Sequence, residues 1–416
     1  MSNDLNQEFV VGLDAGGTRT RAVLAAAEDG RSLGEGAAGP GNALTVPVPR
    51  LTDHLAEALA LTVPEWARAR VVAVAGGFAG ATAASSEEPG HVNARTALTA
   101  ALERLGIPVH RVRICSDIEA AFASAPGTPA DGLALVAGTG AVALRITDRR
   151  STATVDGDGW LLGDDGSGFW IGRSAVRAAL RMADGRGQGT ALAVSVGRAL
   201  GVPDEVLPGG GSGDRREGLS TGGSRDRREE PLAGGSHDPR EVRLGGGSLD
   251  RREPLPGGGS HDRREPLPAG GSNDPREPLP GGGSHDRREP PPADADWSRA
   301  RREAYRMHVL PAVMAELPIR LARFAPLVVE AAREKDAVAE RILDEAADQL
   351  TDTVRALEPV PGERIVATGG LLGPEGPLTA PLTARLHTLG LTLDWVPDGC
   401  RGAVALARLA HGGDPR

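Results

Sequence analysis

The chain has 416 residues, a formal net charge of -9 and a pI near 5.6. This length is sufficient for two domains, because single hydrophobic cores stop growing at roughly 250–300 residues. The acidic balance excludes the basic face that a nucleic-acid partner requires, and no apolar run approaches the ~20 residues of a membrane helix.

Targeting and redox features favour a cytoplasmic protein. The start of the chain has neither the basic nor the apolar region of a signal peptide. Its two cysteines, Cys115 and Cys400, stand far apart and in no metal-binding spacing. The one lysine, Lys335, lies outside any Gly-Lys-Ser/Thr motif, which excludes a Walker-type phosphate loop.

Apolar periodicity and glycine breaks predict the same pattern of elements twice. In the first half we expect strands over residues 9–13 and 21–26, a third strand after Gly30, and strands over residues 71–75 and 112–114. Two helices are expected, one carrying Leu51, Leu55 and Leu59 and the other carrying Leu98, Leu102 and Leu105. In the second half we expect strands over residues 133–137 and 141–146, one further short strand, and strands over residues 364–367 and 391–395. Helices are expected over residues 169–182 and 297–357, after Gly370, and from Gly402 onward. Each half therefore predicts a mixed sheet flanked by helices.

The fold class that follows is α/β, with two similar domains and a cleft between them, where ligands usually bind. The first domain is expected over residues 1–130 and the second over 131–207 and 293–416. Residues 208–292 separate the two parts of the second domain. The final helix is expected to pack back on the first domain.

The insert at 208–292 is a twelve-residue repeat. Serines recur at this spacing from Ser212 to Ser284, each preceded by Gly-Gly and followed by an aspartate and an Arg-Glu pair. The segment has no aromatic residue and only isolated leucines, so it has too little apolar surface to offset its ordering entropy. We interpret it as a disordered, charge-balanced linker.

Three glycine-rich turns follow the ends of apolar strands. Their candidate binding residues are Asp14, Gly16, Gly17 and Thr18 in the first, Gly138, Thr139 and Gly140 in the second, and Gly369 and Gly370 in the third. Glycine lets backbone N–H groups approach an anion closely, and a carboxylate such as Asp14 can hold Mg²⁺. The first two turns therefore predict a polyphosphate site. The third predicts a surface for a flat ring at a helix start. Ordinary hairpins and a packing turn are the structural alternatives.

Three polar residues are further candidates. Asp117 follows the strand at 112–114 and could accept a proton from an attacking hydroxyl, although an aspartate there could equally cap a helix. Asp164, in a glycine-flanked acidic pair, and Asn42 could bind sugar hydroxyls. Capping of the following helix is the alternative for Asp164.

These motifs in this order resemble the BadF/BadG/BcrA/BcrD ATPase family, which includes N-acetylglucosamine and glucosamine kinases of the actin-like superfamily. The strongest likeness is at residues 162–173, which read Leu-Gly-Asp-Asp-Gly-Ser-Gly-Phe-Trp-Ile-Gly-Arg against a family pattern L-G-D-E-G-S-G-Y-W-I-G-R. Residues 156–159 lack the family's tryptophan, Asp165 replaces its glutamate, and Arg19 stands where lysine is common.

The resemblance implies an ATP- and Mg²⁺-dependent sugar kinase acting on an amino sugar. In it, Asp117 would be the catalytic base, Asp14 the metal residue, and Asn42, Asp117 and Asp164 the sugar contacts. The two glycine loops would hold the phosphates, and Gly369 and Gly370 the adenosine. Its partner is a small sugar, and a homodimer is the candidate assembly. Two alternatives stay open: the family's ATPase activators of radical dehydratases, and a sugar-sensing module without catalysis.

Overall fold

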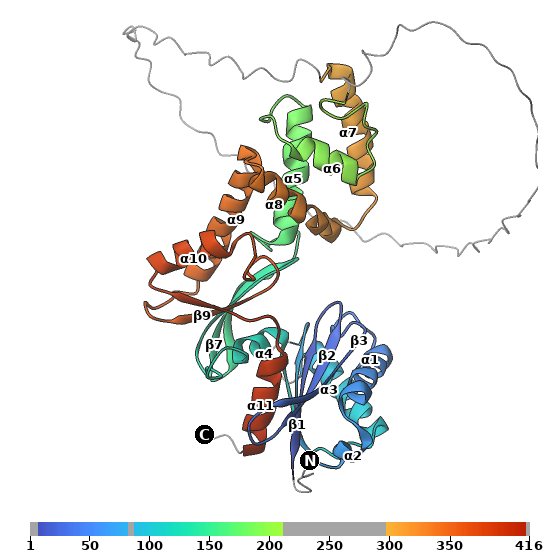
Figure 1. Ribbon diagram of the computed structural model, residues 1–416, viewed down its shortest axis with the longest axis vertical. Helices are drawn as coiled ribbons and strands as arrows, with labels where there is room; N and C mark the ends of the chain where they lie inside the picture. Colours follow the sequence, from blue (N-terminus) through green and yellow to red (C-terminus); the bar gives the residue numbers. More distant parts are fainter. Residues whose placement is uncertain (1–6, 82–86, 211–296, 413–416) are drawn as a thin grey trace, which may run out of the picture. The chain divides into compact units, whose positions relative to one another are not determined.

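The structure is a computed structural model that describes residues 7–81, 87–210 and 297–412. The repeat at 208–292 therefore lies almost entirely outside the described residues. Residues 1–213 and 292–416 form one compact unit, which contains two five-stranded sheets (Figure 1).

The first sheet has the strand order β3-β2-β1-β4-β5. Its strands are β1 (Phe9–Ala15), β2 (Thr20–Ala26), β3 (Ser32–Ala38), β4 (Val71–Phe78) and β5 (Arg111–Ser116). The first three strands run antiparallel to one another, whereas β4 and β5 run parallel to β1. The carboxyl ends of β1, β4 and β5 therefore meet at one edge of the sheet.

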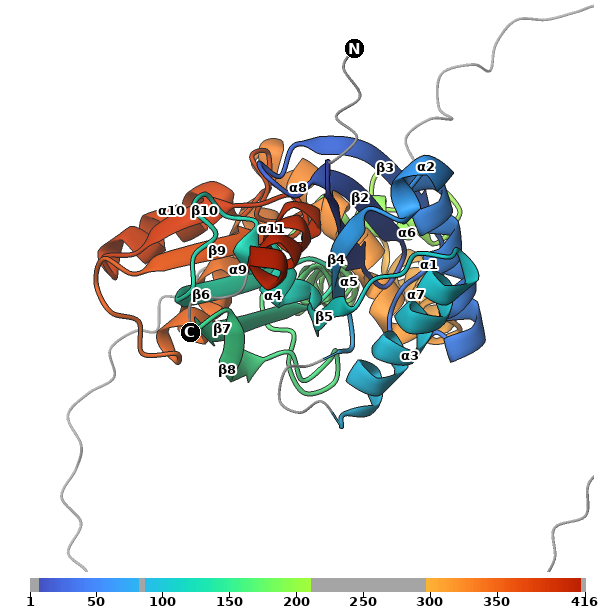
Figure 2. The same ribbon diagram turned by 90° about the horizontal axis from the view of Figure 1, so that it is seen from below.

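Alternation along β1 explains how both faces of this sheet are covered. Phe9, Val11 and Leu13 are buried against α1 (Val48–Thr62) and α3 (Pro89–Arg104), with α2 (Glu65–Arg68) between these two helices in the chain. Val10 is buried on the other face, against α4 (Asp117–Ala123) and α11 (Cys400–Gly412). Figure 2 shows the two helix pairs on opposite sides of β1 and β4. The last helix thus packs on the first sheet.

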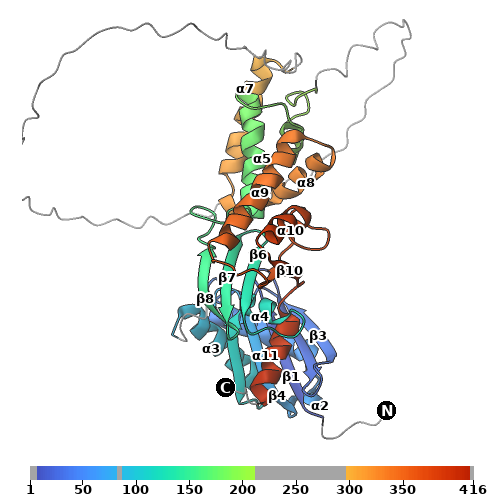
Figure 3. The ribbon, with the colours of Figure 1, turned by 90° about the vertical axis from the view of Figure 1, so that its left-hand side faces the viewer.

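The second sheet has the order β10-β9-β6-β7-β8. Its strands are β6 (Gly132–Ala137), β7 (Ala141–Thr147), β8 (Arg150–Asp156), β9 (Arg364–Thr368) and β10 (Thr392–Trp395). Buried residues of β6 and β9 share one core with the helices α5 (Gly168–Ala183), α6 (Leu192–Ala199), α7 (Arg299–Met314), α8 (Ala325–Arg333), α9 (Ala337–Arg355) and α10 (Thr379–Thr388). Figure 3 shows α5, α8 and α9 next to one another.

The single helical stretch expected over 297–357 is wrong in detail. The chain forms three helices there, α7, α8 and α9, with a 3₁₀ segment at Pro318–Phe324 between α7 and α8. Proline lacks the backbone N–H that a continuing helix needs, so Pro318 and Pro326 start new segments. Lys335 adopts a left-handed φ of 69°, and the Asp336 side chain then caps α9 by accepting bonds from the Val338 and Ala339 N–H groups.

The described residues on either side of the insert lie in direct contact. The indole Nε1 of Trp297 donates a hydrogen bond of 2.8 Å to the Val206 carbonyl, and Arg301 Nε donates one of 2.6 Å to the Glu205 carbonyl. Trp297 and Leu207 are both buried. A short connection can therefore join the two chain ends.

Deletion of residues 214–291, closed with a short Gly-Ser linker, should leave a folded protein. Closure entropy changes by only ~0.6 kcal/mol for each doubling of loop length, so the melting temperature should stay the same or rise slightly. The measurement is thermal unfolding beside the full chain. A deletion protein that is insoluble, or that unfolds at a clearly lower temperature, would contradict this expectation.

Candidate active site

The first glycine loop joins β1 to β2. The Gly16 N–H donates to the Arg19 carbonyl at 2.9 Å, and the Gly16 carbonyl accepts from the Gly41 N–H at 2.8 Å. These bonds fix the base of the loop, while Gly17 and Thr18 are exposed at its tip. A Cβ built on Gly17 meets no atom within 4 Å, so the tip is open to a ligand.

Asp14 lies at the end of β1, on the sheet face that α11 covers. Its Oδ2 accepts a long hydrogen bond of 3.4 Å from the Gly399 N–H. Burial raises the pKa of the Asp14 carboxyl, and the nearby Asp398 adds to this. The Asp14 carboxyl is thus largely shielded from water and lies at the base of the first glycine loop.

Asp117 is the first residue of α4, and Ser116 is the residue that caps this helix. Ser116 Oγ accepts from the Glu119 N–H at 3.0 Å, and Glu119 Oε2 accepts from the Ser116 N–H at 2.9 Å. This reciprocal capping box satisfies the helix start. The alternative that Asp117 is the cap is therefore wrong, and its carboxylate is available for another role.

The electrostatic environment of Asp117 suits proton transfer. Burial raises the pKa of its carboxyl to about 6, and the neighbouring Asp14 carboxylate contributes in the same direction. Asp14 is the penultimate residue of β1 and Asp117 follows β5, and the carboxyl ends of these strands meet at the same sheet edge. An acid with a pKa near the working pH is an efficient general base.

The donor set near Asp14 fits a hard cation only through oxygen ligands. Asp14, Asp398 and Cys400 carry candidate ligand atoms within 4.8 Å of one another. Asp398 Oδ2, however, lies 2.5 Å from Arg21, and burial raises the pKa of the Cys400 thiol, which keeps its sulfur protonated. Mg²⁺ binds through one or two carboxylates and completes its shell with water and phosphate oxygens. The Asp14 carboxylate fits that demand.

The second glycine loop and the Gly369-Gly370 turn line one pocket. The pocket has a volume of about 590 Å³, and its wall includes Gly138, Thr139, Gly370 and Leu371. The rest of its lining is Gly168, Ala322, Ala325, Pro326, Val329, Glu330, Arg333 and Pro377. A mostly apolar hollow of this size, with glycine backbone at one side, suits a flat heterocycle.

Close backbone contacts hold this pocket together. The Gly168 N–H donates to the Gly138 carbonyl at 2.8 Å, which anchors the second loop on the start of α5. Gly369 has φ of +106°, and a Cβ there would lie 2.2 Å from the Ala137 carbonyl oxygen. Only glycine fits at this approach. No helix opens at the Gly369-Gly370 turn, contrary to our expectation, since α10 begins at Thr379.

Asp164 supports the second glycine loop. Its Oδ1 accepts from the Ala141 N–H at 3.1 Å and would lie 2.7 Å from a Cβ at Gly140. The backbone at Asp164 is left-handed, with φ of 58°, and its N–H donates to Asp156 Oδ1 at 2.7 Å. Burial raises the pKa of the Asp164 carboxyl. The acidic motif and the second loop thus form one hydrogen-bonded unit.

Asn42 follows the strand β3 and sits beside Gly80. Its Oδ1 accepts from the Leu44 and Thr45 N–H groups at 2.9 and 3.0 Å, which forms a turn. Within the described part of the chain, no bond is recorded for its Nδ2 group. The side chain is therefore oriented by its oxygen and keeps two donors for a ligand.

Two residues of this region were missed by the sequence analysis. Asp156 accepts from the N–H groups of Asp164 and Asp165 at 2.7 and 2.9 Å, and so shapes the acidic motif. Asp398 contacts Arg21, and the N–H of the next residue, Gly399, reaches Asp14. A signal for Asp398 was present, because it follows a strand and precedes a glycine at a helix start.

Comparisons with known proteins agree with this architecture. The sequence profile described as the BadF/BadG/BcrA/BcrD ATPase family matches residues 11–381. An N-acetylmuramic acid/N-acetylglucosamine kinase from Clostridium acetobutylicum is 37% identical over 62 residues, which are 15% of this chain and 20% of that relative. The matched segment therefore spans only a fifth of the relative's length.

Two solved structures share the fold. A protein provisionally named as an N-acetylglucosamine kinase, from Chromobacterium violaceum, has a TM-score of 0.55 and 17% identity, covering 97% of this chain and 99% of its own. A similarly named protein from Porphyromonas gingivalis has a TM-score of 0.54 and 15% identity, covering 98% and 99%. Among the described residues, none of the helices has the length and apolar character to cross a membrane.

Proposed function

Because the chain belongs to the BadF/BadG/BcrA/BcrD ATPase family, we propose that it is a sugar kinase that transfers the γ-phosphoryl group of ATP to a hydroxyl of an amino sugar. The observation that carries this proposal is Asp117, whose burial beside Asp14 raises its pKa to about 6. Asp117 does not cap α4, and its carboxylate lies at the sheet edge where β1 leads into the first glycine loop.

In the proposed reaction Asp117 orients the sugar hydroxyl and accepts its proton as the oxygen bonds to phosphorus. The bond from phosphorus to the β,γ-bridging oxygen breaks, and ADP leaves with that oxygen. The two glycine loops would hold the phosphates through backbone N–H groups. Mg²⁺, held by Asp14, would supply charge neutralisation of the phosphates.

The substrate contacts are assigned to polar groups near the loops. Asn42 keeps its amide donors, and Asp164 Oδ2 is the carboxylate oxygen that the second loop does not use. The 590 Å³ pocket at Gly370 would take the adenosine. The choice of an amino sugar rests on the family and on the names of the similar proteins.

A coupled ADP-release assay tests the proposal directly. The arms are glucosamine, N-acetylglucosamine, glucose, N-acetylmannosamine and no sugar, each with ATP and Mg²⁺. One or both of the first two sugars should raise the rate far above the arm without sugar. Equal ADP release in all five arms would overturn the kinase proposal.

The activity should depend on pH through Asp117. Its pKa of about 6 means that the carboxylate is lost as pH falls, so log kcat/KM should decline with unit slope below pH 6 and be level above it. A profile from pH 4.5 to 8.5 measures this. A level profile down to pH 4.5 would show that Asp117 is not the base.

Asp164 offers a test that separates loop support from charge. Asp164→Asn keeps an oxygen for the Ala141 N–H and tolerates the left-handed backbone, so it should retain ATP affinity but lose sugar affinity. Asp164→Ala removes the acceptor and strains the backbone, at roughly 1–3 kcal/mol, and should weaken both ligands and the fold. Calorimetry with each ligand makes the measurement. If the two variants changed the ATP and sugar affinities equally, Asp164 would not be a sugar contact.

The activator ATPase alternative has less support from the cysteines. Cys115 and Cys400 are both buried, and burial raises the pKa of each thiol, so neither sulfur is a ready thiolate for an exposed iron–sulfur cluster. Iron analysis and a visible spectrum of anaerobically purified protein would distinguish the two functions.

A further inference from the structure

Helix α4, which carries Asp117 at its start, contacts both sheets. On one side Ala120 and Ala123 share a core with buried residues of β1, β4 and α11. On the other side Ala121 and Phe122 share a core with buried residues of β6, β7 and β9. Because α4 has only seven residues, the contacts at its two ends determine where the Asp117 carboxylate lies relative to both sheets.

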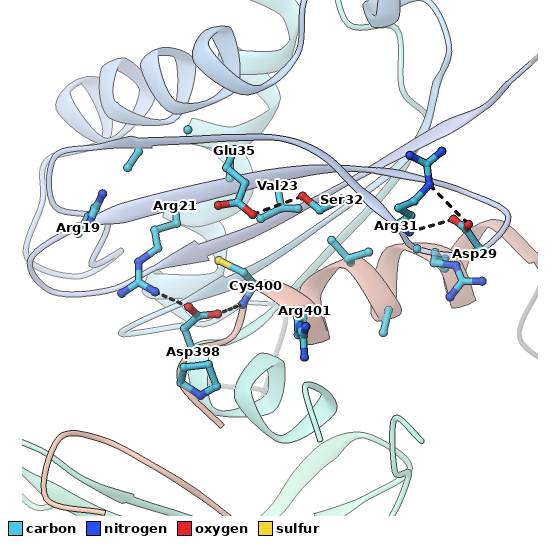
Figure 4. A pocket seen from close by; sticks show the side chains of 18 residues that line it. Arg19, Arg21, Val23, Asp29, Arg31, Ser32, Glu35, Asp398, Cys400 and Arg401 are labelled. Carbon is cyan, nitrogen blue, oxygen red and sulfur yellow. Dashed lines mark hydrogen bonds and ion pairs between the residues drawn. The ribbon is translucent and has the colours of Figure 1, made fainter. Parts of the chain in front are cut away.

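The carboxyl end of α4 is held on the start of α11. Ser124, which follows α4, donates its hydroxyl to the Asp398 carbonyl at 2.9 Å and accepts from the Gly402 N–H at 2.8 Å. Asp398 in turn pairs with Arg21 of β2 at 2.5 Å, and Figure 4 shows this pair beside Cys400 at the start of α11. This end of the helix is therefore fixed relative to the first sheet.

Glu119 provides the contact at the other end of α4. It is only 2% exposed, and both of its carboxylate oxygens accept hydrogen bonds. Oε2 accepts from the Ser116 N–H at 2.9 Å, which is part of the capping box at the end of β5. Oε1 accepts from the Ser151 N–H at 2.7 Å, and Ser151 lies in β8 of the second sheet. One carboxylate therefore joins the last residue of a strand in the first sheet to a strand of the second sheet.

The bond to β8 is what a glutamate adds at this position. Glutamine serves as well as glutamate in a capping box, because the box needs only one acceptor oxygen from this side chain. A carboxylate has two acceptor oxygens, whereas an amide has one. The second bond reaches β8, the edge strand of the second sheet, which has no neighbouring strand on its outer side. The contact between the start of α4 and this edge therefore rests on the Glu119 side chain rather than on strand pairing.

We propose that Glu119 is a positioning residue of the phosphoryl transfer: it ties the start of α4 to β8 and so holds the Asp117 carboxylate in place for the attacking hydroxyl. Strand β8 pairs with β7, and β7 begins at Ala141, directly after the second glycine loop. A base must lie within hydrogen-bond distance of the proton that it accepts, and a displacement of about 1 Å can lower the rate about 10²-fold. This role rests on the proposed kinase function, in which Asp117 is the base.

Two variants of the full chain break the tie in different ways. Glu119→Gln keeps one acceptor oxygen for the capping box and loses the bond to β8, whereas Glu119→Asp keeps the charge on a side chain too short to reach both N–H groups. Each should lower kcat about 10–100-fold, while the KM values for ATP and for the sugar change less than about twofold. The assay is run at pH 8, where Asp117, with a pKa of about 6, is ionised. Glu340→Gln removes the same charge from the exposed first turn of α9 and should leave kcat unchanged.

Hydrogen exchange tests the tie without any substrate. The Ser151 amide should exchange at least about tenfold faster in both variants than in the wild type, whereas the Ser116 amide of Glu119→Gln should stay within about twofold of the wild-type rate. Unchanged exchange at Ser151 would overturn the tie, whether or not the protein phosphorylates a sugar. Normal kcat in a variant whose Ser151 amide exchanges quickly, or a loss of kcat in Glu119→Gln alone, would overturn the positioning role.

Discussion

Asp117→Asn should lower kcat by about 10²–10⁴-fold, because asparagine cannot accept the proton of the attacking hydroxyl. ATP affinity should change little. The amide oxygen of the introduced side chain can still accept the Ile118 N–H that Asp117 Oδ1 accepts at 3.0 Å, so the start of α4 is preserved. Steady-state kinetics and nucleotide calorimetry measure the two effects. Near-normal turnover would show that Asp117 has no part in proton transfer.

Asp131→Asn is the matched control for this variant. Asp131 is exposed, and its Oδ1 accepts the Asp148 N–H at 3.0 Å, so the substitution has the same chemistry with the same kind of bond. It should leave kcat unchanged.

The same Asp117→Asn substitution should stabilise the fold at neutral pH. Burial raises the folded-state pKa from 3.8 to about 6, so folded protein holds the proton more tightly than unfolded protein. The wild type therefore loses stability as pH rises from about 4 to 6, by up to roughly 3 kcal/mol, and the loss persists above pH 6. Denaturant unfolding should give the variant a larger free energy of unfolding than the wild type at pH 8 and an equal one near pH 4. Together, lost turnover and gained stability would indicate a functional acid kept at a structural cost.

The sheets were predictable from the sequence because their signals are local. Apolar runs end at glycine turns, and strands predicted at 9–13 and 133–137 are the cores of β1 and β6. The division of residues 297–357 into separate helices was harder to predict. The apolar periodicity continues across Pro318 and Pro326, whereas the backbone N–H groups that these prolines lack interrupt the helix. The turn at Gly369 was misassigned for a related reason: a glycine after a strand suits a helix start and a non-helical turn equally.

The residues that complete the site depend on contacts between distant segments. Asp398 and Arg21 are 377 positions apart, and no periodicity relates them. The Ser116 cap could have been recognised from the Ser-x-x-Glu spacing, which is a known capping-box signature. Asp156 was visible only as a departure from the family pattern, and its role emerges from the bonds it accepts from the acidic motif.

Gly370→Val should abolish tight ATP binding without unfolding the protein. A Cβ at Gly370 meets no protein atom within 4 Å, and its φ lies outside the left-handed region, so valine fits the backbone. The same position lines the 590 Å³ pocket, so the added side chain must occupy space that the adenosine needs. We expect the Kd for ATP to rise at least ~100-fold, which corresponds to roughly 2.7 kcal/mol. The melting temperature should remain near that of the wild type.

Two other glycines make this prediction specific to the pocket. Gly189→Val is the matched control, since its Cβ is equally open and its backbone equally permissive, but it lies outside the pocket; it should leave ATP affinity intact. Gly369→Val is the opposite case, because its Cβ would lie 2.2 Å from the Ala137 oxygen at φ of +106°, and it should destabilise the fold. Calorimetry with ATP and thermal unfolding of all three variants separate ligand exclusion from misfolding. Unchanged ATP affinity in a folded Gly370→Val protein would mean that adenosine binds elsewhere.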